Sequence, residues 1–297
     1  MLRHKNNWGR LRIFAVIFWG ILLGLTSVQA QQVYVLNGHA LYEEPFFDSA
    51  FIAENHIKQV TARVSYKDDN RPVKRLRTYW QFEYDQQGTF IRENKILDRG
   101  SWLDSLNVAL KFNKVNQIVH RRERNSFGIH YYAFEYNAEG LPFREVYSRP
   151  AVMELDSRSV FFNYQQFGDT ILKKIHVNKL ELPFKEELFK YNDLGNPVEY
   201  TEKRHITGLT EHRFWKYNEQ DQLVELTIEK YKPTSKTTVY RYIYNDSGRL
   251  EVENIFENEE QTEHNEFVYK NGMLDAFLSR DEVTHRITII EFAYEYY

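Results

Sequence analysis

The sequence predicts an all-β protein: a repetitive antiparallel β-meander of about nine two-stranded units, in a strongly twisted or curled sheet. Three observations lead to this fold class. A short phrase, an aromatic residue followed by a turn that ends in glycine, recurs at a nearly fixed spacing. The segments that enter these turns alternate large apolar residues with polar ones, which is the period of a strand. Helix-period segments are scarce after residue 31, and the chain has no cysteine, so burial and the strand ladder must stabilise it without disulfides.

The recurring phrase is best preserved at Tyr244–Leu250, which reads Tyr-Asn-Asp-Ser-Gly-Arg-Leu. The aromatic residues that open its copies lie at positions 84, 112, 136, 164, 191, 217, 244, 269 and 294, in steps of 24 to 28 residues. A nearly fixed period of this size is the signature of a repeat architecture. Clear repeats therefore span 84–297. We expect a degenerate first unit from about Phe51 and a closing strand at Thr288–Tyr296.

Each copy of the phrase has the chemistry of a tight hairpin turn. An Asn or Asp at the first turn position can accept a hydrogen bond from the backbone two residues on. The last turn position requires a positive φ, and every residue at that position is Gly, Asn or Asp, the types that tolerate it. The predicted structural turn residues are Gly88, Asn116, Gly140, Gly168, Gly195, Asp221, Gly248 and Gly272.

The strands before these turns predict one packed face. The residue two positions before each aromatic anchor is also large and apolar, as in Phe189/Tyr191 and Trp215/Tyr217, while the residue between them is polar for most of the chain. A period of two places each pair on one face of its strand. A sheet of about eighteen strands rarely stays flat and open. We expect it to curl into a barrel, a half-shell or a folded-over sandwich, with the aromatic ladder on the inner face.

The first thirty residues predict a secretory signal peptide. A basic start precedes the apolar run Ile13–Leu25, and Val28-Gln29-Ala30 offers a cleavage site after Ala30. The alternative is an uncleaved anchor, although the apolar run is shorter than the ~20 residues that a membrane span needs. Residues 31–297 are expected to form a single β-repeat domain. It would be exported to the periplasm, the cell surface or the medium, with no insertion into a membrane after cleavage.

The charge of the exported part argues against two kinds of partner. Residues 31–297 carry 35 Lys and Arg against 42 Asp and Glu, a formal charge of −7. A net negative chain is a poor match for nucleic acid or for an anionic membrane surface. We therefore expect no nucleic-acid partner.

The phrase at Tyr244–Leu250 closely resembles the YD repeat of the Rhs family, whose consensus begins Tyr-Asp and runs through Gly-Arg-Leu. Tyr84-Asp85 carries the literal dipeptide, and most other copies carry Tyr-Asn. The resemblance implies a spiralling β-sheet shell of the kind found in secreted and surface-exposed bacterial proteins, some of which are described as carbohydrate-binding. The chain is too short to wrap a toxin domain, as the large members do, and no segment matches a self-cleavage site.

Motifs that carry chemistry are absent from the sequence. It contains no phosphate loop, dinucleotide fingerprint, serine-elbow motif or zinc-protease helix. His205 and His212, which flank a predicted turn, come closest to a pair that could share a metal or a proton. We assign no catalytic, cofactor-binding or metal-binding residue. The candidate ligand contact is Trp102, which lies in a predicted long loop between units.

These features favour an exported, non-enzymatic repeat-sheet protein used for binding or surface scaffolding. Its partner would be an envelope protein or a glycan. Binding would use the loops predicted opposite the recurring turns, because these vary most in length: Glu93–Asn107, Ser148–Ser159, Lys232–Lys236 and Glu257–Asn265.

Two alternative functions stay open. A carbohydrate-active enzyme would need two carboxylates facing each other at ~5–10 Å in a cleft. An outer-membrane β-barrel would need a continuous lipid-facing apolar band.

Overall fold

The computed structural model describes residues 47–150, 155–232 and 234–297. The predicted signal peptide lies outside the described residues. One short helix, α2 (Ser49–Glu54), precedes eighteen strands. The strands are β1 (Ile57–Lys67), β2 (Lys74–Tyr84), β3 (Phe90–Asp98), β4 (Leu103–Phe112), β5 (Ile118–Asn125), β6 (Gly128–Tyr136), β7 (Pro142–Pro150), β8 (Leu155–Phe167), β9 (Ile171–Val177), β10 (Pro183–Tyr191), β11 (Pro197–Arg204), β12 (Thr210–Tyr217), β13 (Leu223–Tyr231), β14 (Lys236–Tyr244), β15 (Leu250–Glu257), β16 (Glu260–Lys270), β17 (Met273–Asp281) and β18 (Ile287–Tyr296).

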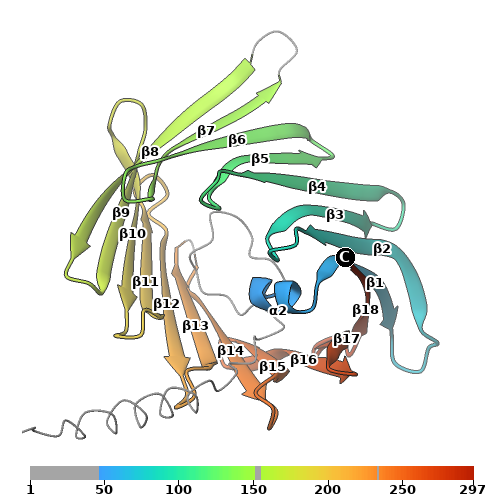
Figure 1. Ribbon diagram of the computed structural model, residues 1–297. Coiled ribbons are helices and arrows are strands. Elements are labelled where there is room, and N and C mark those ends of the chain that lie inside the picture. The colour runs from blue at the N-terminus through green and yellow to red at the C-terminus, as the bar shows by residue number, and fades with distance from the viewer. Residues whose placement is uncertain (1–46, 151–154, 233) are drawn as a thin grey trace, which may run out of the picture. The chain divides into compact units, whose positions relative to one another are not determined.

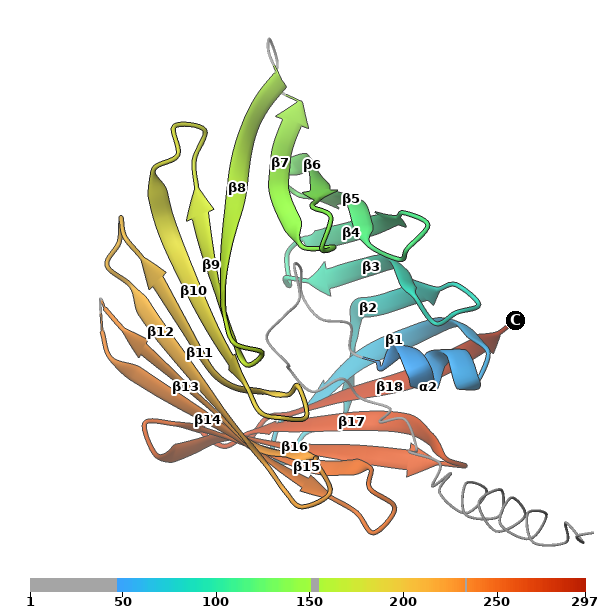
Figure 2. The same ribbon diagram turned by 60° about the vertical axis from the view of Figure 1, so that its left-hand side comes forward.

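The strands form one closed antiparallel barrel (Figure 1). Each strand pairs with its neighbours in sequence, and β18 pairs with β1, with Tyr294 opposite Val60 and Ile287 opposite Lys67. The turned view shows the same ring of tilted strands (Figure 2). The predicted all-β meander is confirmed, and of the three forms left open the sheet adopts the barrel. The expected closing strand agrees with β18 to within one residue at its start.

The closure involves the degenerate first unit. Its second strand is β1, which follows a turn where His56 has a φ of 53°. In place of an entering strand the chain forms α2, whose N-terminus is capped by the Asp48 carboxylate on the amides of Ala50 and Phe51. In the other units, the second strand pairs with the strand that enters the turn. In the first unit that place beside β1 is taken by β18. The first and last segments of the sheet thus share one unit.

The aromatic ladder faces the inside of the barrel. Helix α2 lies within the ring of strands in Figure 1. Phe47, just before α2, packs edge-on against the ladder residues Phe82, Phe292 and Tyr294, with ring centroids 6.4, 5.4 and 6.1 Å apart. The buried members of the ladder in the other units are Phe134, Phe162, Phe189, Trp215, Tyr242 and Phe267.

The outer face carries charged side chains that pair across strands. Lys190, between Phe189 and Tyr191, binds Glu199 of the next strand at 2.7 Å. Glu225 binds Lys216 at 2.6 Å on one side and Arg241 at 3.2 Å on the other. The alternation predicted for the strands therefore separates an aromatic inside from a polar outside.

The recurring turns have the predicted geometry. All eight residues assigned to the last turn position have positive φ, between 60° and 84°. The Asn or Asp side chain at the first turn position was expected to accept one backbone hydrogen bond, and that of Asn245 accepts two. In the best-preserved copy, Asn245 Oδ1 accepts hydrogen bonds from the amides of both Ser247 and Arg249, at 3.1 and 3.0 Å. One side chain therefore holds the whole turn closed.

The anchor tyrosines connect successive units. The hydroxyl of an anchor donates to the carbonyl oxygen of the residue that stands two after the turn residue of the preceding unit, at 2.6–2.9 Å. The pairs are Tyr136–Ile118, Tyr164–Pro142, Tyr217–Pro197, Tyr244–Leu223, Tyr269–Leu250 and Tyr294–Leu274. Phe would fill the same space but could not make this bond, which gives a physical reason for Tyr at this position.

Removing one of these hydroxyls is expected to weaken the barrel measurably. Tyr244→Phe should lower the free energy of unfolding by about 1 kcal/mol, because the Leu223 carbonyl loses its donor in a partly buried place. Tyr231→Phe is the control, since that hydroxyl binds only the Glu229 carboxylate on the exposed side of a strand. Urea unfolding of residues 31–297 measures both. Equal losses would show that the inter-unit bond has no special weight.

Two of the four segments predicted as loops are mostly strand, so the prediction is wrong for these two. Lys232–Lys236 connects β13 to the start of β14, as predicted, and Ser148–Ser159 lies partly outside the described residues. Glu93–Asn107 runs through β3 and β4, which pair as far as Asp98 and Leu103. Glu257–Asn265 is largely β16. Their polar residues suggested loops, but they alternate on a sheet whose outer face is polar. Trp102 therefore lies in the short β3–β4 connection, where its side chain is exposed.

Candidate functional site

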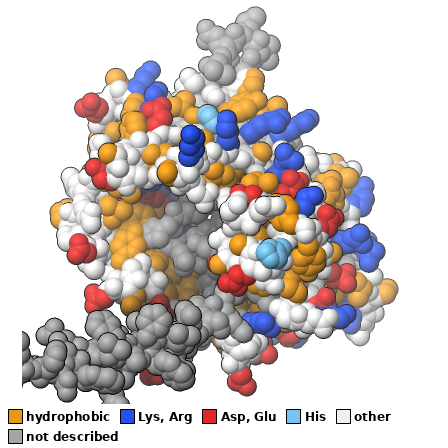
Figure 3. All heavy atoms as spheres, in the orientation of Figure 1, with side chains coloured by type: hydrophobic (Ala, Val, Ile, Leu, Met, Phe, Trp, Pro, Cys, Tyr) orange, Lys and Arg blue, Asp and Glu red, His pale blue; other side chains and the backbone are white. Residues whose placement is uncertain are grey.

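The interior wall of the barrel is the candidate site, and it has two different parts. Around β13–β18 and β1 the inward positions are mainly apolar: Leu226, Tyr242, Phe267, Phe277, Ile290, Phe292, Val60 and Ala62. Around β9–β12 charged side chains join the aromatic ladder. The space-filling view looks into the hollow end of the barrel, where hydrophobic side chains line part of the visible wall (Figure 3).

The charged part is centred on Glu187, which is 8% exposed. Its carboxylate lies 2.5 Å from His176 Nε2, 2.9 Å from Lys185 Nζ and 2.8 Å from the Tyr200 hydroxyl. Lys174 Nζ is 3.6 Å away. These groups come from three adjacent strands, β9, β10 and β11, because Lys185 and Glu187 share the inward face with the ladder residue Phe189.

A second buried carboxylate, Glu202, shares two of these partners. It lies 2.8 Å from Lys185 Nζ, 2.9 Å from the Tyr200 hydroxyl and 2.5 Å from Arg204 Nε. Lys185 and Tyr200 thus bridge Glu187 and Glu202. The same pairing recurs on β12, where Glu211 binds Arg213 and Lys230.

The bridge fixes the protonation states of this network. Burial alone would raise the pKa of the Glu187 carboxyl, but the hydrogen bond from His176 and the charges of Lys174 and Lys185 together bring it below its usual value. Burial lowers the pKa of His176, so it donates as a neutral imidazole at neutral pH. Burial and the two nearby carboxylates raise the pKa of the Tyr200 hydroxyl. The Glu187 and Glu202 carboxylates are therefore ionised, and both are already bound by Lys185 and Tyr200.

A different acidic group lies on the apolar part of the wall. Burial raises the pKa of the Glu253 carboxyl; it accepts a hydrogen bond from Asn265 Nδ2 at 2.7 Å, and the charge of Glu263 raises its pKa further. Burial, followed by the charges of Asp281 and Glu257, raises the pKa of Glu263 as well. Within residues 47–150, 155–232 and 234–297, no Lys, Arg or His forms an ion pair with Glu253 or Glu263 of the kind that surrounds Glu187.

His205 and His212, the two histidines considered from the sequence, bind different partners. His205 Nε2 lies 3.3 Å from the Glu186 carboxylate, whereas His212 Nδ1 lies 3.1 Å from the Thr201 hydroxyl. Among the described residues, no group of three or more His, Cys, Asp or Glu is placed to hold a metal ion.

The buried ion pairs were not predicted from the sequence, although the sequence carries a signal for them. Lys185, Glu187, Phe189 and Tyr191 form one period-two series, so the charged residues had to share the face of the aromatic anchors. Carboxylates are common in this chain, and only the paired strands show which of them meet a cation.

The fold and its wall define the class of protein: a closed up-and-down antiparallel β-barrel with an aromatic interior and an ion-paired exterior. In the part of the chain that the structure describes, no helix has the length and apolar character to cross a membrane.

Comparison with known proteins adds likenesses of fold. The sequence matches no family model and no curated protein. A porin-like protein from Bacteroides uniformis is similar, with a TM-score of 0.41 and 9% identity over 81% of this chain and 97% of that chain. A porin-like protein from Bacteroides vulgatus gives a TM-score of 0.31 and 11% identity over 78% and 97% of the two chains. A LolA superfamily protein from Nitrosomonas europaea gives 0.16 and 8% over 80% and 84%. We base no functional inference on likenesses this distant.

Proposed function

We propose that the chain is an exported, non-enzymatic binding protein that holds a guest against the apolar part of its barrel interior. One observation carries the proposal: in a closed barrel the aromatic face is turned inward, while the outward face is charged and ion-paired. Large apolar side chains that line a concave wall are the usual surface for an apolar or amphipathic ligand.

In the charged part of the wall, the state of Glu187 and Glu202 favours binding over catalysis. A carbohydrate-active enzyme needs one carboxylate free to give a proton and another free to accept one or to attack. Glu187 and Glu202 are instead bridged by Lys185 and Tyr200. Bridged carboxylates of this kind stabilise the wall and orient its side chains. The charged part of the wall would also contact the charged end of an amphipathic guest.

Two neighbouring residues on β15 offer a matched test of the interior site. Ile255 points inward, opposite Tyr240, and Phe256 points outward, where its ring contacts Arg241. Residues 31–297 should bind a fluorescent apolar probe such as N-phenyl-1-naphthylamine. Ile255→Gln should weaken that binding about tenfold, because an apolar contact worth ~1.5 kcal/mol is lost. Phe256→Gln should leave binding unchanged.

Two results with the Ile255→Gln and Phe256→Gln variants would contradict the proposal. If both variants bind the probe like the parent chain, or if the outward substitution has the larger effect, the guest does not lie in the barrel. Melting curves of both variants are recorded first, so that a change in binding is compared between folded proteins.

An outer-membrane barrel is the second candidate, and the closure of an even number of antiparallel strands favours it. The outward charges oppose it. Arg241, inside β14, would face lipid at a cost of about 2–4 kcal/mol near the bilayer midplane, and Lys190 and Lys216, one residue before the ends of β10 and β12, would add less. Carbonate extraction of cell membranes separates the two candidates. We expect the protein in the soluble fraction; a protein that stays in the pellet would favour the membrane barrel.

We further propose that the chain is a short, exported relative of the YD-repeat proteins. The signal-peptide pattern of residues 1–30 supports export. The recurring turns, together with the bonds that the anchor tyrosines make between units, support the repeat relationship.

A further inference from the structure

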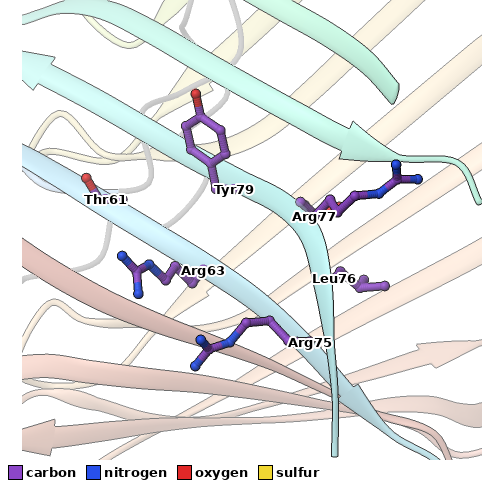
Figure 4. A pocket seen from close by; sticks show the side chains of 7 residues that line it. Thr61, Arg63, Arg75, Leu76, Arg77 and Tyr79 are labelled. Carbon is purple, nitrogen blue, oxygen red and sulfur yellow. The ribbon is translucent and has the colours of Figure 1, made fainter. Parts of the chain in front are cut away.

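The pairing of β1 with β2 contains an irregularity that opens a groove. Arg63 pairs with Tyr79, but Ser65 pairs with Arg75, so the single residue Val64 faces three residues of β2. A cavity of about 400 Å³ lies at this place, lined by Thr61, Arg63, Arg75, Leu76, Arg77 and Tyr79 (Figure 4). We call it the arginine groove.

The arginine groove belongs to the outside of the barrel. Arg63 and Tyr79 alternate with the inward residues Ala62 and Phe82 on their strands, and both are exposed. A ligand in the groove therefore approaches from solvent, without entering the barrel.

The three arginines of the groove differ in what already binds them. Arg77 is fixed: its guanidinium contacts the Asp98 carboxylate through two bonds of 3.1 Å and donates to the Gly100 carbonyl at 3.1 Å. Within the described part of the chain, Arg63 and Arg75 take part in no ion pair. Figure 4 shows these two side chains extending in the same direction from neighbouring strands, away from Arg77. Two guanidinium groups are thus available to one ligand.

The charge around these two groups is only partly balanced. Glu291 is the register partner of Arg63 on β18, and it is exposed and lies in no ion pair with it among the described residues. One carboxylate beside two arginines leaves a net positive site. Guanidinium groups match the paired oxygens of phosphate and carboxylate groups in geometry as well as in charge.

One exposed aromatic ring lines the same groove, and Trp102 is not among the residues that line it. Tyr79 lines it and is 38% exposed. Trp102, the candidate ligand contact from the sequence, is 50% exposed and stands two residues after Gly100, whose carbonyl Arg77 binds. Rings of this kind offer a flat apolar face with a polar edge, which suits the face of a sugar ring.

We propose that the arginine groove binds a sugar that carries an oxyanion, either a phosphate ester or a carboxylate. Arg63 and Arg75 take the anion, and Tyr79 takes the sugar face. The volume is at the small end of the range of ligand sites, which suits a group about the size of one sugar. This site is independent of the barrel interior, so either proposal can fail while the other stands.

Calorimetric titration of residues 31–297 at low salt tests the proposal. The probes are glucose 6-phosphate, glucuronate, glucose and inorganic phosphate. We expect at least one acidic sugar to bind about tenfold more tightly than glucose and inorganic phosphate. Arg63→Gln and Arg75→Gln should each weaken that binding about tenfold, and Tyr79→Leu should reduce the preference for the sugar over inorganic phosphate.

Arg122→Gln is the matched control, because Arg122 is an exposed arginine on β5 outside the groove. Binding of glucose 6-phosphate alone assigns a phosphate ester, and binding of glucuronate alone assigns a carboxylate; both support the site. The proposal is overturned if no acidic sugar binds, if inorganic phosphate binds as tightly as the sugars, or if Arg122→Gln weakens binding as much as the groove variants.

Discussion

Gly88→Ala is expected to cost about 3 kcal/mol of stability, whereas Gly195→Ala, at the same position of another repeat, should cost about 1 kcal/mol. Both glycines have positive φ, 78° and 84°, so both variants carry the same backbone penalty. They differ in surroundings. A methyl group on Gly88 would stand 2.1 Å from the Ser49 carbonyl oxygen and 2.9 Å from the Ala53 amide nitrogen, whereas nothing lies within 4 Å of one on Gly195.

The larger effect at Gly88 reflects the contact between its turn and α2. Backbone atoms cannot move aside as a flexible side chain can, so the helix has to shift and expose Phe51 and Ile52, which are almost fully buried. Urea unfolding of residues 31–297 measures both variants, and limited proteolysis reports whether α2 has been released. Equal losses at the two glycines would mean that α2 does not pack against this turn.

Glu187→Gln and Glu253→Gln should change stability in opposite directions at neutral pH. The pKa of Glu187 is below its ordinary value in the folded state, so its ionised form stabilises the fold above the unfolded pKa. Removing that charge leaves Lys174 without its carboxylate partner and leaves Lys185 with Glu202 alone, which should cost about 3 kcal/mol at pH 7. The loss should shrink as the pH falls through the folded pKa, where the parent carboxylate is itself protonated.

For Glu253 the dependence of stability on pH has the opposite direction. Its pKa is raised by burial, so the folded state favours the protonated form, and its stability falls as the pH rises through the folded pKa. Gln keeps an acceptor for Asn265 without the charge, so the variant should melt at a higher temperature than the parent chain at pH 7 and at a similar one below about pH 4. Melting curves from pH 3 to pH 8 measure both variants; the Glu187→Gln loss should stay nearly constant from pH 8 to about pH 5, because the folded pKa of Glu187 lies well below that range. A destabilised Glu253→Gln at pH 7 would show that the carboxylate has a cationic partner.

Much of the fold could be predicted because its determinants are local. The turn needs only an amide such as Asn245 and a glycine such as Gly248, within five residues of each other. The inward face follows from pairs such as Phe189 and Tyr191, and the strand number from the period. Each of these patterns lies within one repeat unit, and its recurrence in the other units made the prediction stronger.

The features that could not be predicted depend on distant parts of the chain. Closure depends on the accumulated twist and on the register of β18 against β1, which no single repeat encodes. Helix α2 is six residues long, and its clearest signal was the cap at Asp48. The arginine groove arises from a mismatch between β1 and β2, and no local pattern in the sequence marks Arg63 or Arg75 as members of one site.

The shared unit formed by β18 and β1 has a consequence for folding. Each of the two strands has its partner at the opposite end of the sheet: Val60 meets Tyr294, and the Tyr297 amide reaches the His56 carbonyl. Such a contact is slow to form because a very long loop must close first. Until it forms, both strands are open edges that invite pairing with another molecule. The pairing of β1 with β18 is therefore expected to form last. A chain that lacked β18 would leave the edges of both β1 and β17 unpaired.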